Sequence, residues 1–353
     1  MLTSNDKYHE LCVGVFYWTE DHGITRLTSN TLRELGCRVV DFYINENLPN
    51  DLDIVFVLGP FGSMVPIIKQ LIARTSTKHP FLIFQHTEPF PNPALSEWIR
   101  YPVALLRSKL ERRTFRRVDN ARWVKIPHLE WMTSKAFRYR YYGDLYWIKQ
   151  SGIPYLLSVD SPLAVEFLRA RGFNTIYANG FWFPNQPQWG ADLGLKRDIP
   201  VLWIGKYGSG RRKRLLHRIR SELLDRNVDI LCIDGVEKPY IFGEERTELL
   251  NRTKVVLNLL RQNWDNNSMR LFLAALNRAL IISETMLPHN PAFVEGKHMI
   301  EAPINQLTET IVYYLSHDSE RQQITDEAYK LVTEKITTQN TLGWILDIAI
   351  DRV

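Results

Sequence analysis

The feature that most constrains this chain is a repeated alternation of short apolar runs with amphipathic segments. Runs such as Ile54–Pro60 and Phe81–Phe84 are apolar throughout, rather than at every second residue. That pattern is typical of strands covered on both faces. Between such runs, segments such as Gly23–Leu35 and Arg211–Leu224 place apolar residues at helical spacing. The sequence therefore predicts an α/β fold of parallel sheets between layers of helices.

The alternation stops once, in a stretch that separates two expected domains. Gly180–Gly190 is rich in proline, glycine and aromatic residues and has neither period, and strand and helix patterns restart at Val201. At 353 residues the chain exceeds the usual size of one domain. We therefore expect an N-terminal domain over residues 1–180 and a C-terminal domain over residues 181–338. A C-terminal helix over residues 339–353 is expected to pack back on the N-terminal domain.

Composition narrows the class of protein. Hydrophobic residues make up 45% and charged residues 24% of the chain, which excludes wholesale disorder. Cys12, Cys37 and Cys232 lie in apolar runs without a C-x-x-C partner, so we expect reduced thiols and no thiolate zinc site. No apolar run reaches membrane-spanning length, and the first ten residues lack the apolar core of a signal peptide. We expect a cytoplasmic protein.

Positive charge is concentrated in a basic, aromatic insert over residues 97–141. This insert holds twelve Lys or Arg against four acids, in a chain of net charge +5. One interpretation is a solvated helical face whose arginine stems cover apolar neighbours. A second is peripheral contact with an anionic membrane, on its inner face. A nucleic-acid surface is the least favoured, because no nucleic-acid-binding motif accompanies the charge.

A glycine-rich basic turn follows the predicted strand Val201–Ile204. It contains Gly205 and Lys206 and leads into a helix that begins with Arg211 and Arg212. Glycines let backbone N–H groups approach an anion, a helix N-terminus favours one, and arginine can clamp phosphate oxygens. The turn matches neither G-x-x-x-x-G-K-[ST] nor G-x-G-x-x-G. It indicates either a phosphate site or a flexible turn before a solvated basic helix.

A second polar loop lies between another predicted strand and helix. It begins at Asn258 and includes Asn267, and Ser268 is the expected N-cap of a helix that ends near Asn277. Arg270 falls in the first turn of that helix, where a cation is unfavourable unless an anion is bound. An anion site and an exposed arginine are the two interpretations.

Two loops in the first half carry candidate acid–base groups. Asp21 and His22 follow the first predicted strand and can supply a general base, although a loop histidine is more often inert. His86 and Glu88 follow another strand, where a proline-rich turn is the alternative. No H-E-x-x-H motif or His/Cys cluster stands out, so no metal site is expected.

The order of the motifs in the second half resembles GT-B glycosyltransferases. The similar proteins are the group-1/family-4-like set that includes the CgeB-like spore-maturation proteins, and the resemblance covers about Val201 to Leu346. It rests on the order of several weak motifs rather than on any single one. These motifs are Val201–Gly205, Gly235–Tyr240, Val255–Leu259, Ser268–Phe272 and Ala279–Glu284.

This resemblance implies two Rossmann-like domains facing across a cleft, with the donor in the C-terminal domain and the acceptor in the N-terminal one. The expected activity is metal-independent hexosyl transfer from a UDP- or GDP-sugar to a glycan, lipid or protein, with no separate cofactor. The residues expected to bind the nucleotide sugar are Gly205, Lys206, Arg211, Arg212, Tyr240, Asn258, Asn267, Ser268 and Arg270.

One departure from the family pattern leaves alternatives open. A Glu-x7-Glu motif common in the family falls here at Asp265 and Leu273. Asp265 can contact the sugar and joins Asp21 and His22 as a candidate catalytic residue, whereas Leu273 cannot accept a hydrogen bond from ribose. A non-catalytic GT-B-like scaffold or ligand-binding protein is therefore an alternative. A dehydrogenase is disfavoured by the missing G-x-G-x-x-G.

Overall fold

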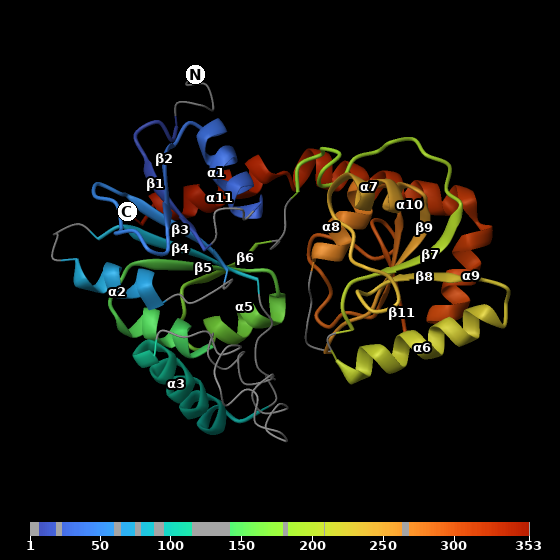
Figure 1. Cartoon of the computed structure of the whole chain (residues 1–353), viewed down its shortest axis with the longest axis horizontal. Coiled ribbons are helices and arrows are strands. Elements are labelled where there is room, and N and C mark those ends of the chain that lie inside the picture. The colour runs from blue at the N-terminus through green and yellow to red at the C-terminus, as the bar shows by residue number, and fades with distance from the viewer. Residues whose placement is uncertain are drawn as a thin grey trace. The chain divides into compact units, whose positions relative to one another are not determined.

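The chain divides into two compact units, each built around its own parallel sheet (Figure 1). The predicted α/β class is confirmed. The first unit comprises residues 1–160, 164–178 and 342–353, and the second comprises residues 161–163 and 179–341. This computed structural model describes residues 7–18, 23–59, 65–74, 79–87, 95–114, 142–178, 183–207, 209–262 and 268–352.

The first unit contains a six-stranded sheet in the order β2-β1-β3-β4-β5-β6, with every neighbouring pair parallel. Every residue of β1, β3 and β4 is buried, as expected for strands between two helical layers. The strands are β1 (Cys12–Tyr17), β2 (Arg38–Tyr43), β3 (Ile54–Gly59), β4 (Phe81–His86), β5 (Tyr155–Val159) and β6 (Thr175–Tyr177).

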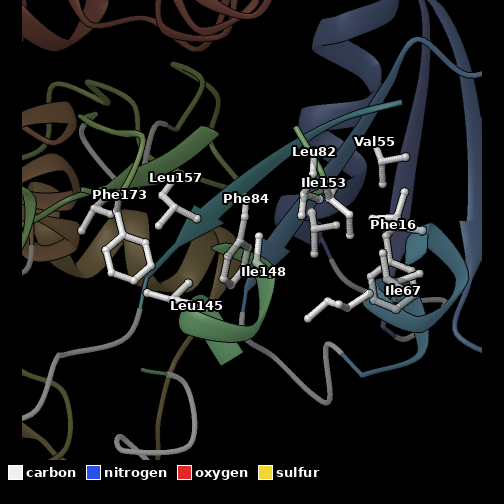
Figure 2. Packing of buried hydrophobic residues seen from close by; sticks show 14 of the residues in the cluster. Phe16, Val55, Ile67, Leu82, Phe84, Leu145, Ile148, Ile153, Leu157 and Phe173 are labelled. Atoms are coloured by element: carbon white, nitrogen blue, oxygen red, sulfur yellow. The ribbon is translucent and has the colours of Figure 1, made fainter. Parts of the chain in front are cut away.

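The helices and the sheet of this unit pack around an apolar core (Figure 2). Phe84 of β4 and Leu157 of β5 pack in one cluster with Ile67 from the helix that follows β3 and with Ile148 from the helical segment 142–150. These side chains come from segments far apart in the chain, so their burial fixes the sheet between its helices. The named helices are α1 (Gly23–Glu34), α2 (Val65–Ala73), α3 (Glu97–Thr114) and α5 (Pro162–Arg169).

Helix α11 (Thr338–Ile350), near the end of the sequence, contacts residues near its beginning. The Tyr8 hydroxyl lies 3.1 Å from the Gly343 carbonyl oxygen and 2.6 Å from Asp347 Oδ1. Lys7 Nζ lies 2.7 Å from the same carboxylate. Residues 342–353 are therefore part of the first unit, although all of the second unit precedes them in the chain.

The second unit contains a five-stranded parallel sheet in the order β11-β10-β9-β7-β8. Strand β7 lies between β8 and β9. The next strand in the chain, β8, pairs with one edge of β7, and the following strand, β9, pairs with the other edge. This reversal of strand order is where open α/β sheets bind ligands. The strands are β7 (Ile199–Ile204), β8 (Ile230–Ile233), β9 (Thr253–Asn258), β10 (Leu280–Glu284) and β11 (Ile300–Ala302).

Helices cover both faces of this second sheet. Helices α6 and α9 contact each other, and α8 contacts α10. No helix in the described residues has the length and apolar character required to cross a membrane. The helices are α6 (Gly210–Leu224), α7 (Gly243–Asn251), α8 (Met269–Leu276), α9 (Leu307–Ser316), α10 (Asp318–Lys330) and the π-helix η3 (Leu331–Lys335).

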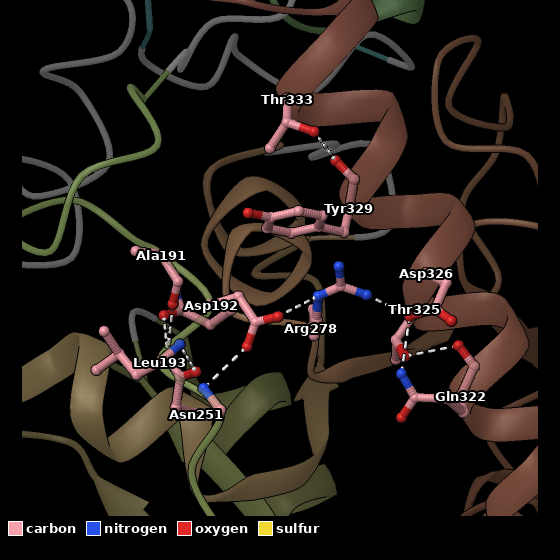
Figure 3. A network of polar contacts seen from close by, with 12 residues as sticks. Ala191, Asp192, Leu193, Asn251, Arg278, Gln322, Thr325, Asp326, Tyr329 and Thr333 are labelled. Atoms are coloured by element: carbon pink, nitrogen blue, oxygen red, sulfur yellow. Dashed lines mark hydrogen bonds and ion pairs between the residues drawn. The ribbon is translucent and has the colours of Figure 1, made fainter.

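The segment before β7 is fixed on the second unit by a polar network (Figure 3). Arg278 pairs with Asp192 at 2.6 Å and also with Asp326, and its guanidinium lies 4.1 Å from the centre of the Tyr329 ring. Asn251 donates a hydrogen bond of 2.7 Å to the carbonyl of residue 191. The residues that follow the proline- and glycine-rich stretch thus contact α7 and the end of α8, and through Arg278 they are linked to α10.

Candidate functional site

A pocket of about 380 Å³ opens at the carboxyl ends of β7 and β9, where the strand order reverses. Its volume lies at the lower end of the range for small-molecule sites. Loops after three strands contribute to it, together with residues from α6, α7 and α8. The lining residues are Ile204–Lys206, Arg212, Tyr240–Phe242, Arg246, Asn258–Arg261, Met269, Arg270 and Leu273.

All charged side chains among the described residues that line this pocket are cations. They come from the loops after β7 and β9 and from the first turns of α6, α7 and α8, and no Asp or Glu is among them. Positive charge gathered in a crevice with low-dielectric walls attracts an anionic ligand. These cations are Lys206, Arg212, Arg246, Arg261 and Arg270.

Arg270 lies in the first turn of α8 and is held across the ends of two strands. Its Nε donates to the Ile204 carbonyl at 3.1 Å and its Nη1 donates to Asn258 Oδ1 at 2.5 Å. Its guanidinium also lies 4.6 Å from the centre of the buried Trp203 ring, a cation–π arrangement. The first-turn cation that the sequence singled out is thus pre-positioned at the pocket.

Gly205 permits this close approach. Its φ of +123° is in the region that other residues rarely adopt, and a Cβ built there would lie 3.1 Å from Arg270 Nη2. A side chain at this position would therefore strain the backbone and press on the Arg270 guanidinium.

Helix α6 begins with a serine cap that is tied to the opposite loop. Ser209 Oγ accepts from the Arg212 backbone N–H at 3.2 Å and donates to the Arg261 carbonyl at 2.7 Å. The buried Arg212 side chain donates to the Lys206 carbonyl at 3.0 Å. These hydrogen bonds therefore link the loops after β7 and β9 at the N-terminus of α6.

Arg211 takes a different role from the one expected. It does not line the pocket but donates to both oxygens of the buried Glu284, at 3.0 and 2.5 Å, and to the Leu260 carbonyl at 3.1 Å. The hydrogen bonds that Arg211 donates to Glu284 raise the pKa of Arg211. Its contacts thus hold the loop after β9 against the end of β10.

Aromatic residues line the pocket beside Lys206. The Tyr240 hydroxyl donates to the Asp234 carbonyl at 2.5 Å, and Lys206 Nζ lies 5.7 Å from the centre of the Tyr240 ring. Phe242 is 71% exposed, and its ring centre is 6.4 Å from that of Tyr240. Exposed ring faces next to a cationic region can stack on a planar group attached to an anion.

Arg246 is a pocket cation that sequence reasoning missed, as is Arg261. It lies in the first turn of α7, is 6% exposed, and donates weakly to the carbonyls of Gln188 and Trp189 at 3.4 and 3.3 Å. No carboxylate among the described residues contacts it, and burial lowers its pKa. A first-turn cation was the signal that pointed to Arg270, and the same signal is present at Arg246.

The structure brings together most of the residues that the sequence assigned to the donor. Ser268 occupies the N-cap position of α8, but its side chain makes no capping hydrogen bond, contrary to expectation. Asn267 and the candidate catalytic residues Asp21, His22 and Asp265 lie outside the described residues, so these roles stay predictions. The expected donor residues that line the pocket are Gly205, Lys206, Arg212, Tyr240, Asn258 and Arg270.

The structure describes only part of the other sites expected from the sequence. His86 is buried at the end of β4 in the first unit, and Glu88 lies outside the described residues. Helix α3 forms the first part of the basic insert and exposes Trp98 and Leu106, whereas residues 115–141 lie outside the description. The membrane and nucleic-acid interpretations of this insert stay predictions. Within the described ranges, no three His, Cys, Asp or Glu side chains form a group able to hold a metal.

Comparison with known proteins gives one family match. Residues 211–347 match the family model described as "Glycosyl transferase-like". The matched region runs from the start of α6 into α11 and contains much of the pocket. Among curated proteins, none matches the sequence.

Several solved structures share the fold at low sequence identity. TarM, a protein of S. aureus, matches with a TM-score of 0.51 and 10% identity over 84% of this chain, which spans only 54% of TarM. The T4 phage BGT in complex with its UDP-glucose substrate matches with a TM-score of 0.51 and 11% identity, over 97% of this chain and 99% of that one. AviGT4, a glycosyltransferase involved in avilamycin A biosynthesis, matches with a TM-score of 0.50 and 11% identity, over 96% and 97% of the two chains.

These findings define the class of fold. The chain has the α/β fold of GT-B glycosyltransferases, and residues 211–347 carry a glycosyl transferase-like domain. The recognition made from the sequence is confirmed to that extent. The more specific resemblance to CgeB-like proteins stays a prediction.

Proposed function

We propose that this protein is a glycosyltransferase that binds a UDP- or GDP-sugar in the pocket at the ends of β7 and β9. The observation that carries the proposal is the exclusively cationic charge of the described lining, at the point where the strand order reverses. Donor sugar would then pass to a hydroxyl group of a glycan, lipid or protein acceptor. Complexes of two proteins with a similar fold support this donor class: the T4 phage BGT holds UDP-glucose, and a TarM variant holds UDP.

The pocket residues suit the chemistry of the leaving group. In the transfer, the acceptor oxygen forms a bond to the anomeric carbon while the bond from that carbon to the diphosphate oxygen breaks. The acceptor proton passes to a base, for which Asp21, His22 and Asp265 are the candidates. Negative charge grows on the departing diphosphate, and positioned guanidinium groups such as those of Arg270 and Arg212 stabilise that charge. We assign the stabilisation to these cations and expect a chelator of divalent metals to leave transfer unchanged.

Nucleotide binding to a matched pair of variants tests the site. Lys206 is exposed and lines the pocket, whereas Lys213 is exposed on α6 and does not. By calorimetry with UDP and GDP, we expect Lys206→Met to weaken the better ligand about tenfold, the value of one charge-assisted hydrogen bond. Lys213→Met should bind as the wild type does. Absence of binding for both nucleotides in the wild type would refute the proposal.

A second measurement separates an enzyme from the non-catalytic alternative. Leu273 lines the pocket at a position where the family pattern has an acid, which is the observation that favours a binding protein without turnover. Release of free sugar from UDP- and GDP-hexoses, measured over hours, reports residual donor hydrolysis. Tight nucleotide binding without hydrolysis, and without transfer to any acceptor fraction, would identify the protein as the non-catalytic form.

A further inference from the structure

Helix α3 of the first unit has an exposed apolar face. Trp98 is 76% exposed, and Leu106, about two turns later, is 59% exposed. Ile99 and Val103 are exposed between them, and the positions of these four residues share one face of a helix. Single exposed apolar residues are ordinary, but several large ones on one helix face mark a contact surface.

The opposite face of α3 is used by the fold itself. Ser108 Oγ donates to Asp144 Oδ1 at 2.6 Å, and a Cβ built on Gly143 would lie 2.1 Å from the Ala104 carbonyl oxygen. Both contacts are with the helical segment that precedes β5. Arg100 is also buried on this side of the helix. Because these contacts hold α3 on the first unit, at whose edge it lies in Figure 1, the apolar face is left for another partner.

Positive charge follows the apolar face along the chain. The insert over residues 97–141 holds twelve Lys or Arg against four acids. Part of this charge lies in α3 itself, where the residues after Leu106 include four cations and one acid: Arg107, Lys109, Arg112, Arg113 and Glu111. Among these cations, Lys109 is exposed. The second half of α3 therefore adds net positive charge to the apolar surface of the first half.

An anionic lipid surface suits both properties at once. Apolar side chains enter the boundary between headgroups and acyl chains, tryptophan favours that boundary, and cations remain among the anionic headgroups. A second copy of the chain is disfavoured, because contact through α3 would bring two strongly basic inserts together. A nucleic acid would attract the cations but would leave Ile99 and Val103 without an apolar partner.

We infer that α3 binds the surface of a membrane that contains anionic lipids, with Trp98 and Leu106 inserted at the level of the headgroups. The charges of α3 keep it in the plane of the interface. This inference goes beyond the proposed function, because it concerns a surface of the first unit outside the nucleotide pocket. It holds whether or not the protein transfers a sugar.

Cosedimentation of the full chain with lipid vesicles tests the inference. One set of vesicles is phosphatidylcholine alone, and in the other set phosphatidylglycerol replaces about a third of it. We expect the anionic vesicles to bind about tenfold more tightly, since each cation near an anionic surface adds to the attraction. Binding should weaken as NaCl rises from about 0.05 M to about 0.5 M, because salt screens these charges. No binding to either set, or equal binding to both, would overturn the inference.

A double variant separates the apolar contact from the attraction of charge. Trp98→Ser with Leu106→Ser keeps every cation, and we expect it to bind the anionic vesicles about tenfold more weakly than the wild type. The control, Leu224→Ser with Val236→Ser, removes two similarly exposed apolar side chains from the second unit and should bind as the wild type does. Unchanged vesicle binding by the α3 variant would overturn the placement of this helix at the membrane.

Two further measurements address the other partners and the folding of the variants. A wild-type dimer that the α3 variant disperses, or binding of duplex DNA or RNA that this variant loses, would assign the face to that partner and overturn the inference. Circular dichroism and UDP and GDP affinity should be the same in all three proteins, because the four positions are exposed and lie outside the pocket lining. If the α3 variant does not fold, the comparison of wild-type binding to the two sets of vesicles decides the question.

Discussion

Two buried arginines, one in each unit, show the difference between a closed structural cluster and an open binding site. Arg100 of α3 is 1% exposed and donates to Glu97 at 3.1 and 2.7 Å, with its guanidinium 4.2 Å from the centre of the Phe167 ring. Arg246 of α7 is nearly as buried but has only two long hydrogen bonds to carbonyls. The first charge is neutralised within the fold, whereas the second has no described counter-ion and suits an anionic ligand.

Of the two arginine environments, the one around Glu97 should contribute more to stability. Besides Arg100, Glu97 accepts from Arg171 at 3.0 Å and from the hydroxyls of Tyr142 and Tyr146 at 2.7 and 2.9 Å. Removal of this carboxylate takes away the acid that faces the buried Arg100 charge.

The largest predicted effect is therefore that of Glu97→Ala. We expect it to lower the free energy of unfolding of the first unit by about 2 kcal/mol, because the buried Arg100 guanidinium and the Tyr142 hydroxyl lose the carboxylate to which they donate. Urea denaturation followed by tryptophan fluorescence measures the change. Glu166→Ala removes an exposed acid on α5 and serves as the control, with an expected change within about 0.5 kcal/mol. Equal losses in the two variants would contradict the assigned role of Glu97.

An intermediate effect is predicted for Arg246→Met, and it appears in binding rather than in stability. Replacement of an uncompensated buried charge by an apolar side chain is often neutral or stabilising, so the free energy of unfolding should fall by less than about 0.5 kcal/mol. Affinity for the better of UDP and GDP should fall roughly tenfold, because a charge-assisted contact is lost. Arg100→Met should show the opposite result: clear destabilisation and unchanged nucleotide affinity. A matching loss of stability in the two variants would break the comparison.

The smallest predicted effect is on pH dependence. Burial tends to raise the pKa of Glu97, but hydrogen bonds from Tyr142, Tyr146, Arg100 and Arg171 outweigh it, and the pKa is lowered. A carboxyl whose pKa is lower in the folded state contributes stability above its unfolded pKa of about 4.3, and that stability is lost as the pH falls through the folded pKa. The stability difference between the wild type and Glu97→Gln should therefore be constant near neutral pH and should shrink in acid. A difference independent of pH down to about 3 would contradict this assignment.

Much of the fold could be predicted from the sequence because continuous apolar runs identify strands of a parallel sheet directly. The predicted strand Val201–Ile204 lies within β7, and the predicted helix Arg211–Leu224 lies within α6. Strand β11 was not predicted because Ile300–Ala302 is only three residues long with a glutamate at its centre. A segment so short carries no period, and only its neighbour β10 makes it a strand.

The site was less predictable because its contacts join residues far apart in the chain. The first-turn position identified Arg270 from local chemistry alone, and the same reasoning would have found Arg246. By contrast, Arg211 looked equivalent to Arg212 in the sequence, yet it pairs with Glu284, which is 73 residues away. No local pattern reveals which of two adjacent arginines faces a ligand and which one faces a carboxylate.

The packing of α11 has a consequence for the order in which the protein is completed on the ribosome. Tyr8 is anchored to Gly343 and Asp347, and residues 342–353 belong to the first unit. The first unit therefore cannot acquire its full set of contacts until the entire second unit has been synthesised. Although it begins earlier, it is finished later, and until then the surface that α11 covers is exposed to chaperones and proteases.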